Sequence, residues 1–587
     1  MIKRVYFASL VLFLTLSLIP TQLVHACGGF FCSNVPINQA TERILFVKRT
    51  DGKITTHVQI QFSGSKTDFA WILPVPSVPE LGISHNSVFQ QLQMATQPTF
   101  QLEWEESDCE FRPPPIFFRD LDGVVPTAGE NVDVIAEERV GPYETAIISS
   151  TDPTAMTQWL INNGYRLDAL GSKLLQPYID MGMYFLALKL APDSDVGDLQ
   201  PIAMTYDAQQ PMIPIQLTAV AAEPDMGVLV WILGQERAIP ENYLHVEINE
   251  AAIDWLNFGA NYNQVVKNAA DEAGGQAFTT EYAGKSDLMA DRIYQAEQFQ
   301  NVGQLSSITD PPRFLSDLLR LGFPRDAQMQ SLIRRHIPIP QQVWNEGVLQ
   351  VIYRGDTKAY EQAKQDSVTF QTTVEQSFYN NMDAYRDYLR EVTFDPIAFI
   401  TDIDNIIITP LRDAQALFTD HPYLTRLYTT LSASEMTVDP MFAFNPDLPD
   451  VSNTHIAKAK YECPQSADTP PEDVIVLITL SDGRELRVKP PFFGIPNPQP
   501  IPLPIFVDAT FNPLSAARIE RLATSGSATF IRGLTPVSPD FNKSGTIDFD
   551  DFLIFAAAFG KRDPNYDLSG DGNVDFRDFL LFMQNYR

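Results

Sequence analysis

A twelve-residue pattern occurs twice near the C-terminus and constrains the local fold more than any other part of the sequence. The segment DFNKSGTIDFDD, which starts at Asp540, corresponds to DLSGDGNVDFRD, which starts at Asp567, at an offset of 27 residues. Both copies have glycine at the sixth position and an apolar residue at the eighth, and both continue into a short apolar run. Such a repeat predicts two copies of one small structural unit.

The polar residues of the repeat fall where a loop can bind calcium. Calcium takes about six to eight oxygen ligands, and a loop of about twelve residues supplies them from positions 1, 3, 5, 7, 9 and 12, with glycine at position 6. The first loop offers Asp540, Asn542, Ser544, the carbonyl of Thr546, Asp548 and Asp551. The second offers Asp567, Ser569, Asp571, the carbonyl of Asn573, Asp575 and Asp578. The sequence therefore predicts two bound Ca²⁺ ions.

The alternative to a calcium unit is a pair of acidic turns that precede two helices. Two matches in tandem, with glycines and ligands in register, favour calcium over this alternative. We expect Ile547 and Val574, at position 8, to pair the two loops through a short strand contact. Because so small a unit cannot build much core, calcium should supply much of its folding free energy.

The sequence around the loops differs from that of an ordinary EF-hand. Two prolines in residues 534–539 exclude a helix before the first loop, and position 12 is Asp in both loops where an EF-hand has Glu. A calcium loop followed by one helix, duplicated in residues 540–587, resembles the dockerin family. The resemblance implies docking onto a cohesin-like or other cell-surface protein.

Two features of the unit bear on its partner. Positions 10 and 11 are Phe549-Asp550 and Phe576-Arg577, where dockerins often carry small hydroxyl residues that touch cohesin. Phenylalanines also recur at three-residue spacing, as Phe549, Phe552 and Phe555 and again as Phe576, Phe579 and Phe582. We interpret this stripe mainly as the core of the unit, with part of it as a docking face.

The first residues of the chain predict export. Lys3 and Arg4 form a short basic segment, residues 5–19 carry no charge, and the small residue Ala26 follows. This is the layout of a secretory signal peptide over residues 1–26. The apolar run is shorter than the roughly 20 residues of a membrane span, so we expect cleavage and no transmembrane segment in the mature chain. An alternative is an envelope lipoprotein with its lipid on Cys27.

Four cysteines, an even number, suggest disulfides in an exported chain; they are Cys27, Cys32, Cys109 and Cys463. Cys27 and Cys32 flank Gly-Gly-Phe-Phe, whose glycines permit a sharp turn, and these two cysteines can close a small loop. Cys109 would then pair with Cys463. A zinc site is the alternative, but it lacks a second close Cys/His pair.

Residues 27–520 predict an α+β body, with a β-rich N-terminal half followed by an α-rich second half. Strand patterns dominate up to about residue 249, including segments 183–191, 213–221 and 226–233, and Asp51-Gly52 marks a hairpin. Helical periodicity follows over about 249–434, and another hairpin is expected around 474–488. This order is typical of α+β proteins. One interpretation divides the body into two subdomains near residue 250. Residues 521–539 suggest a linker, and residues 540–587 a small all-α module.

Several motifs of the body resemble an uncharacterised bacterial family of exported proteins. The family is a domain of unknown function, so the resemblance implies neither a substrate nor a catalytic residue. The motifs are CGGFFC at 27–32, DFAWILPVP at 68–76, WLINNGY at 159–165, YFLALK at 184–189, LTRLYTTL at 424–431 and MTVDP at 436–440.

The remaining signals exclude several classes of function. The formal net charge is −31, and no basic run is present, so nucleic acid is not an expected partner. The chain has no Gly-x-Ser-x-Gly elbow and no His-Glu-x-x-His motif. After the signal peptide its six histidines are far apart, and we interpret each as a surface or core residue; they are His57, His85, His245, His336, His421 and His455.

The leading hypothesis is an exported, calcium-binding modular protein whose C-terminal module docks onto another protein. It assigns no catalytic residue, and whether the body is an enzyme stays open. One rival is a secreted hydrolase that acts on the glycosyl bonds of polysaccharides, because dockerins often accompany such domains. The other rival is a lipid-anchored envelope protein.

Overall fold

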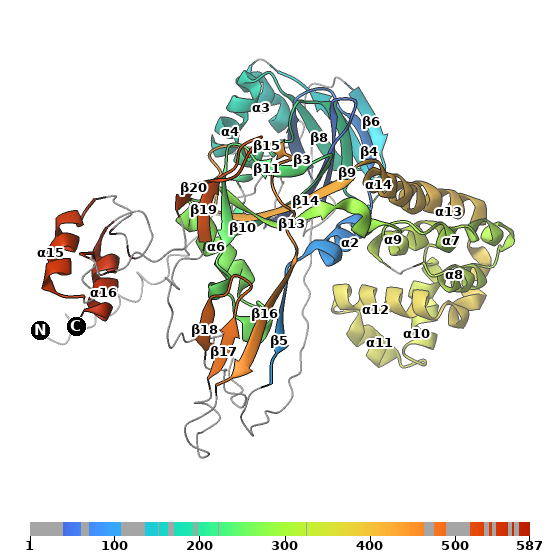
Figure 1. Ribbon diagram of the computed structural model, residues 1–587. Coiled ribbons are helices and arrows are strands. Elements are labelled where there is room, and N and C mark those ends of the chain that lie inside the picture. Colours follow the sequence, from blue (N-terminus) through green and yellow to red (C-terminus); the bar gives the residue numbers. More distant parts are fainter. Residues whose placement is uncertain are drawn as a thin grey trace, which may run out of the picture.

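The computed structural model describes residues 39–59, 70–106, 136–150, 152–162, 169–191, 194, 198–220, 222–323, 326–462, 475–488, 517–532, 539, 541–542, 547–561, 566, 568 and 574–586. Sheets dominate the N-terminal part, helices fill the middle region, and two further helices follow near the C-terminus (Figure 1). This arrangement confirms the predicted fold class. None of the helices in the described part of the chain is long and apolar enough for a membrane span.

A ten-stranded sheet organises the body, in the order β20-β19-β12-β13-β14-β10-β1-β2-β9-β4. Its strands are β1 (Gln39–Lys48), β2 (Lys53–Gln59), β4 (Glu80–Ile83), β9 (Ile202–Asp207), β10 (Ala222–Gly234), β12 (Leu244–Ile248), β13 (Ala277–Lys285), β14 (Tyr423–Leu431), β19 (Ala517–Arg521) and β20 (Thr529–Arg532). Because β10 pairs with both β1 and β14, the sheet continues across the subdomain boundary expected near residue 250.

Three smaller sheets complete the β-structure. One has the order β3-β8-β7-β6, the second β18-β17-β16-β5, and the third pairs β11 with β15. Figure 1 shows the second of these extending downward from the body as a separate lobe. The strands are β3 (Ala70–Val75), β5 (Thr99–Trp104), β6 (Ala136–Val140), β7 (Tyr143–Ile148), β8 (Tyr184–Leu190), β11 (Arg237–Pro240), β15 (Phe442–Asn445), β16 (Thr454–Tyr461), β17 (Val476–Thr479) and β18 (Glu485–Val488).

The helices form around their own core and beside the sheets. The α-helices are α2 (Asn86–Thr96), α3 (Pro153–Asn162), α4 (Ala169–Asp180), α5 (Ile215–Thr218), α6 (Tyr262–Glu272), α7 (Ala296–Phe299), α8 (Pro311–Arg320), α9 (Ala327–His336), α10 (Val348–Val351), α11 (Thr357–Ala363), α12 (Ser367–Asn380), α13 (Pro396–Ile403), α14 (Thr409–Asp420), α15 (Phe549–Ala558) and α16 (Phe576–Asn585). The 3₁₀ and π segments are η3 (Glu250–Ala252), η4 (Trp255–Asn257), η5 (Ser286–Met289), η6 (Val302–Ser307), η7 (Val343–Gly347), η8 (Met382–Glu391) and η9 (Asp404–Ile408).

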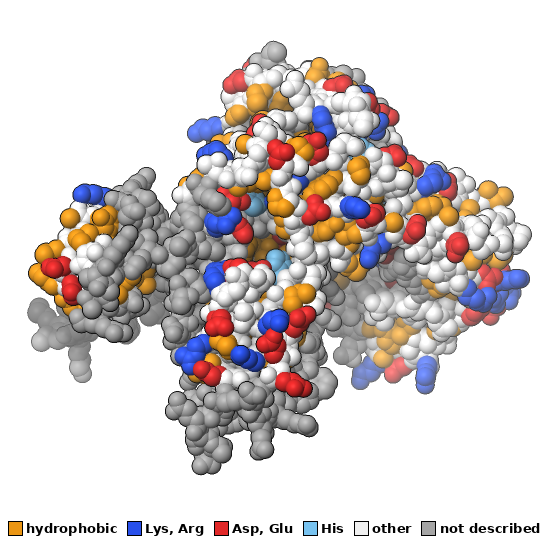
Figure 2. Space-filling model, in the orientation of Figure 1, with side chains coloured by type: hydrophobic (Ala, Val, Ile, Leu, Met, Phe, Trp, Pro, Cys, Tyr) orange, Lys and Arg blue, Asp and Glu red, His pale blue; other side chains and the backbone are white. Residues whose placement is uncertain are grey.

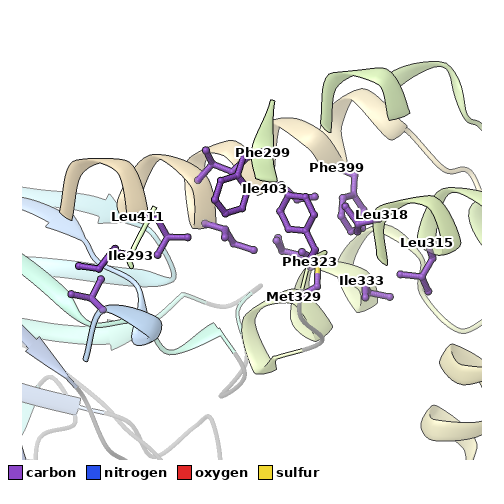
Figure 3. Close-up of a cluster of buried hydrophobic side chains, with 14 of the residues drawn as sticks. Ile293, Phe299, Leu315, Leu318, Phe323, Met329, Ile333, Phe399, Ile403 and Leu411 are labelled. Carbon is purple, nitrogen blue, oxygen red and sulfur yellow. The ribbon is translucent and has the colours of Figure 1, made fainter. Parts of the chain in front are cut away.

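Local sequence explains where many middle-region helices begin. Asp310 precedes α8 and Asp395 precedes α13, and each carboxylate accepts a backbone N–H of the first turn while proline occupies an early helical position. An aspartate cap satisfies a donor that the helix leaves unpaired, and proline there lacks the N–H that would need a partner. Behind these caps, α7, α8, α9 and α13 turn apolar side chains toward one another. Figure 3 shows Phe299 of α7, Phe399 of α13 and Phe323, which follows α8.

Both predicted hairpins are present. Strands β1 and β2 pair antiparallel, with Lys48 opposite Ile54, and Gly52 in the turn has a φ of 89°. This left-handed conformation favours glycine, which explains why Asp-Gly marks the turn. Strands β17 and β18 likewise pair antiparallel, around Gly483.

Two predicted segments of the body differ from the structure. Residues 213–221, expected as a strand, contain α5, because the Asp439 carboxylate accepts the backbone N–H of Gln216 at 3.0 Å in its first turn. The region 249–434, expected to be helical, contains β13 and β14 in the middle of the large sheet. Strand β14 is buried along almost its whole length, so its apolar pattern does not alternate as that of a half-exposed strand would.

The predicted linker at 521–539 begins too early. Residues 517–532 form the hairpin β19–β20, and β19 also pairs with β12, with His245 opposite Glu520. The Ser- and Gly-rich stretch that suggested a linker contains the turn, where Gly526 has a φ of 73°. Turns and linkers share these residue types, so composition alone did not separate them. Residues 533–538 lie outside the described residues, as do the predicted signal peptide and all four cysteines.

The predicted pairing of Cys109 with Cys463 stays a prediction, but the strands before these cysteines are compatible with it. Strands β5 and β16 run parallel with Trp104 opposite Ala459, and the Trp104 ring stacks on Tyr461 at 4.9 Å. Cys109 follows Trp104 by five residues, and Cys463 follows Ala459 by four. Strands β5 and β16 therefore end side by side and point in the same direction, and both cysteines lie outside the described residues.

Glu42 gives the first test of the fold. Burial, and secondarily the charge of Asp439, raises the pKa of this β1 carboxyl from 4.5 to about 7. In the unfolded chain, the Glu42 carboxyl is ionised once the pH exceeds its ordinary pKa of 4.5. In the folded chain, the same carboxyl stays protonated until about pH 7. Glu42 thus destabilises the fold progressively as pH rises through this window. We expect Glu42→Gln to be more stable than the unmodified protein at pH 8, by on the order of 2 kcal/mol, and to show little gain at pH 4.

Urea unfolding at the two pH values measures this difference. Glu144→Gln on β7, where the side chain is exposed, is the matched control and should show no comparable dependence on pH. An equal effect of Glu42→Gln at pH 4 and pH 8 would contradict the assignment.

Candidate functional site

Five of the twelve predicted calcium ligands belong to the described residues, namely Asn542, Asp548, Asp551, Asp575 and Asp578. The other seven lie outside them; these are Asp540, Ser544, Thr546, Asp567, Ser569, Asp571 and Asn573. Within the described ranges, no group of three or more His, Cys, Asp or Glu side chains is arranged to hold a metal ion. The two calcium sites therefore stay a prediction from the sequence.

The described ligands nevertheless have the same geometry in both copies. Helix α15 begins directly after Asp548 and α16 directly after Asp575. In the first copy, the Asp551 carboxylate accepts the backbone N–H of Asp548 at 3.1 Å and that of Asn542 at 2.9 Å. In the second, the Asp578 carboxylate accepts the backbone N–H of Asp575 at 2.7 Å.

Asp551 and Asp578 are both fully buried. A carboxylate at a helix N-terminus is favoured by the helix dipole, but removing an ionised carboxylate from water costs free energy unless charges or hydrogen bonds compensate. The backbone N–H groups of the loops supply part of that compensation. Both position-12 side chains are therefore turned toward the loop in front of their own helix.

The expected strand contact between Ile547 and Val574 is wrong. The Val574 N–H donates to the Lys561 carbonyl at 2.8 Å, and the Val574 carbonyl accepts the Gly560 N–H at 2.7 Å. Gly560, with a φ of 80°, turns the chain at the end of α15. Val574 therefore pairs with the segment that follows this helix, and not with Ile547 of the first loop.

The phenylalanine stripe divides between core and surface. Phe555 and Phe582 are buried and stack with ring centroids 5.5 Å apart. Phe549 and Phe576, which occupy position 10 of their copies, are 58% and 63% exposed. The two helices therefore share a small aromatic core and present equivalent aromatic side chains to solvent.

The body contains a cavity of about 650 Å³ between the large sheet and the lower lobe. Strands β11, β12, β13 and β19 contribute one wall, and residues of β5, η3, β16 and the β17–β18 turn contribute the other. Figure 2 shows this hollow with histidine and acidic side chains at its surface. The residues that line it include Phe100, Arg237, His245, Glu250, Thr280, Glu281, His455, Ser481 and Glu520.

His245 connects three strands on the cavity wall. Its Nδ1 lies 2.8 Å from Glu520 Oε1, and its Nε2 lies 2.9 Å from Thr280 Oγ1. With the proton on Nδ1, the imidazole donates to Glu520 and accepts the hydroxyl of Thr280. Burial raises the pKa of Glu520, but the hydrogen bond with His245 and the nearby arginine charges lower it below the ordinary value. Glu520 is therefore suited to hold His245 in this tautomer.

Arg237 lies next to the same threonine. Its Nη1 donates to the Pro449 carbonyl at 2.7 Å, and its Nη2 donates to Thr280 Oγ1 at 3.3 Å. Its Nε is buried and has no hydrogen-bond partner among the described residues. An unpaired buried donor costs free energy, and the fold tolerates this Nε–H without a partner while the guanidinium lines the cavity.

A second histidine–glutamate pair lies on the opposite wall. His455 Nδ1 is 2.7 Å from Glu250 Oε1, and its ring stacks on Phe100 with centroids 4.8 Å apart. Ser481 Oγ donates to the other Glu250 oxygen at 3.5 Å. The cavity thus carries one His–Glu pair on each wall.

A β-bulge beside the cavity turns neighbouring residues of β13 toward it. Thr280 lies opposite Leu427 and Tyr282 opposite Arg426, so Glu281 is an extra residue in the pairing with β14. Bulges redirect side chains and are frequent next to functional sites. Here the bulge lets Thr280 and Glu281 both contribute to the cavity wall, although consecutive residues of a regular strand face opposite sides.

Glu281 is held by a buried ion pair with Arg426. Arg426 also donates to Thr96 Oγ1 of α2 at 3.2 Å and lies over the Trp231 ring, 5.4 Å from its centroid. Trp231 Nε1 in turn donates to Thr96 Oγ1 at 3.0 Å. These contacts join β10, β13, β14 and α2 behind the cavity.

The sequence did not reveal this cavity. His245 and His455 were interpreted as isolated surface or core histidines, because they are far apart in the chain. Their glutamate partners are just as distant, with Glu520 following His245 by 275 residues and Glu250 preceding His455 by 205. No motif of fixed spacing can signal such pairs, which form only when the large sheet assembles.

Comparison with known proteins concerns the body. Residues 22–314 match the family model described as an uncharacterized protein conserved in bacteria (DUF2330). The match supports the resemblance of the body to a family of unknown function. It includes His245 and Thr280 and ends before His455 and Glu520. No curated protein and no solved structure matches the chain.

Removal of Glu281 should destabilise the body strongly. Loss of one partner leaves the Arg426 charge buried without compensation, so we expect Glu281→Met to lower the free energy of unfolding by about 3–5 kcal/mol. The double variant Glu281→Met/Arg426→Met should be much less destabilised than the sum of the single variants. Urea unfolding followed by tryptophan fluorescence gives the values for this double-mutant cycle.

The exposed pair of Arg390 and Asp387 is the control, since ion pairs in water contribute little. Asp387→Asn should change the unfolding free energy by less than about 1 kcal/mol. Additive effects of the Glu281 and Arg426 substitutions would contradict the assignment of a coupled buried pair.

Proposed function

We propose that residues 540–587 form a calcium-dependent, dockerin-like docking module of an exported protein. The observation that carries this proposal is the equivalent geometry of Asp551 and Asp578. Both are buried carboxylates at position 12, and each accepts the N–H of the position-9 aspartate. In the first copy this contact belongs to a capping box at the start of α15. The complete burial of both carboxylates, and the further contact of Asp551 with the Asn542 N–H, support a common function of the loops beyond helix capping.

The negative charge of the loops favours cation binding as their common function. The first loop brings three carboxylates to ligand positions and the second brings four. Like charges at such spacing repel one another, and a divalent cation converts the repulsion into attraction. Calcium suits the twelve predicted ligands better than a transition metal does, because every predicted ligand atom is a hard oxygen.

The exposed apolar side chains favour a protein as the partner. Besides Phe549 and Phe576, the helices expose Leu553 and Leu580, again at equivalent positions of the two copies. We call these four side chains the docking face. Exposed apolar patches that function does not require are unusual on small soluble units, and aromatic side chains are enriched at protein interfaces. The occupant we propose is a cohesin-like or other cell-surface protein with an apolar binding surface.

Calcium removal should unfold the module and leave the body intact. We expect a chelator to accelerate amide hydrogen exchange in peptides from residues 547–586 of the full chain, because calcium supplies much of the folding free energy of so small a unit. Peptides from β1 and β10 should be unaffected. Exchange measured by mass spectrometry with and without calcium gives the result.

Asp551→Ala should show the accelerated exchange even with calcium present. Asp550→Ala is the control, because Asp550 is exposed and occupies a position that supplies no ligand. Unchanged exchange of residues 547–586 on chelation would refute the calcium proposal.

The docking face should be needed for partner binding. We expect Phe549→Ser/Phe576→Ser in the full chain to reduce retention of a cell-surface partner at least tenfold, in the manner of buried aromatic anchors, without releasing calcium. Retention on the immobilised protein is measured with calcium and with chelator. Val368→Ser is the control, since Val368 is exposed on α12, outside the module. Retention that persists in chelator would rule out calcium-dependent docking through this face.

A further inference from the structure

The cavity of the body holds three side chains in the order of a hydrolytic relay. Thr280 Oγ1 is 2.9 Å from His245 Nε2, and His245 Nδ1 is 2.8 Å from Glu520 Oε1. A hydroxyl, an imidazole and a carboxylate are thus hydrogen-bonded in that order. In such an arrangement the imidazole acts as the base that activates the hydroxyl nucleophile, and the carboxylate orients the imidazole. The three residues come from the adjacent strands β13, β12 and β19.

We propose that Thr280, His245 and Glu520 form an acyl-transfer site that hydrolyses small carboxylic esters. Thr280 is the nucleophile, His245 the general base and acid, and Glu520 a positioning residue for His245. This activity is independent of the calcium module, because the relay lies in the body.

The chemistry balances without any co-reactant other than water. Thr280 Oγ bonds to the ester carbonyl carbon while its proton passes to His245 Nε2. The bond from that carbon to the leaving oxygen then breaks, and the leaving alcohol takes the proton from Nε2. A water molecule attacks the acyl-threonine and gives its proton to Nε2, and the Thr280 oxygen leaves with that proton. The products are an alcohol and a carboxylic acid.

Arg237 completes the site with a donor for the developing negative charge. Its Nη2 already contacts Thr280 Oγ1 at 3.3 Å, so the guanidinium is fixed beside the nucleophile. Donors fixed beside the reacting carbonyl stabilise the oxyanion without having to reorganise during the reaction. Arg237 also lines the cavity, so its positive charge lies beside the carbonyl that Thr280 would attack.

The dimensions and walls of the cavity set the substrate class. A volume of about 650 Å³ suits a small molecule. Opposite the relay, Phe100 and His455 provide a stacked aromatic surface beside the carboxylate of Glu250. The site therefore fits a compact ester with a flat or apolar alcohol part and a short acyl group.

The test uses the full-length protein with a β-lactone probe and with p-nitrophenyl acetate as substrate. We expect the β-lactone to open on Thr280 and to add its mass to the peptide that contains this residue. Thr280→Ala and His245→Gln should each lower kcat/KM for p-nitrophenyl acetate at least 100-fold, whereas Thr280→Ser should retain turnover. His336→Gln is the matched control, since His336 forms a comparable pair with Asp402 at 2.9 Å and does not line the cavity.

Glu520→Gln separates positioning from structural support. The carboxylate holds the His245 Nδ1 proton and so orients the imidazole, so its loss should lower kcat per folded molecule while KM stays unchanged. A purely structural glutamate would change the amount of folded protein and leave kcat per folded molecule unchanged. Folded full-length protein whose Thr280 takes no label, or a Thr280→Ala variant with undiminished turnover, would overturn the proposal whatever the stability of the other variants.

Discussion

Glu281 and Arg426 bury opposite charges in the middle of the large sheet, and each is tolerated there only because of the other. Two such charges leave water at a cost that their attraction and further hydrogen bonds must offset. Arg426 meets this condition through Glu281, Thr96 and the Trp231 ring. The pair fixes β13 against β14, holds α2 on the sheet, and lies at the bulge that brings Thr280 to the cavity wall.

Much of the body follows from local chemistry that a sequence displays. Asp-Gly at residues 51–52 predicts the first hairpin because the turn needs a left-handed backbone at Gly52. The aspartates before α8 and α13 mark helix starts for an equally local reason. Strands β13 and β14 were missed because their buried faces have no alternating pattern, and the hairpin of residues 517–532 was missed because its turn has the composition of a linker.

The two candidate sites differ in how far the sequence could predict them. The predicted calcium ligands follow one another within each twelve-residue loop, so their spacing could be interpreted directly from the sequence. The second copy of the loop gave an independent check of that interpretation. The cavity depends on partners such as His245 and Glu520, which meet only as cross-strand neighbours of β12 and β19. Even in the C-terminal module, sequence left open which phenylalanines form the core. Packing decides this, since Phe555 and Phe582 stack while Phe549 and Phe576 remain exposed.

The central claim is that the C-terminal repeat binds calcium, and the number of ions held by the intact chain tests it most directly. Native mass spectrometry of the full-length protein, purified with calcium and then compared with the chelated protein, counts those ions. The account predicts two Ca²⁺ ions per chain that disappear on chelation. A chain that carries no calcium under these conditions would contradict it.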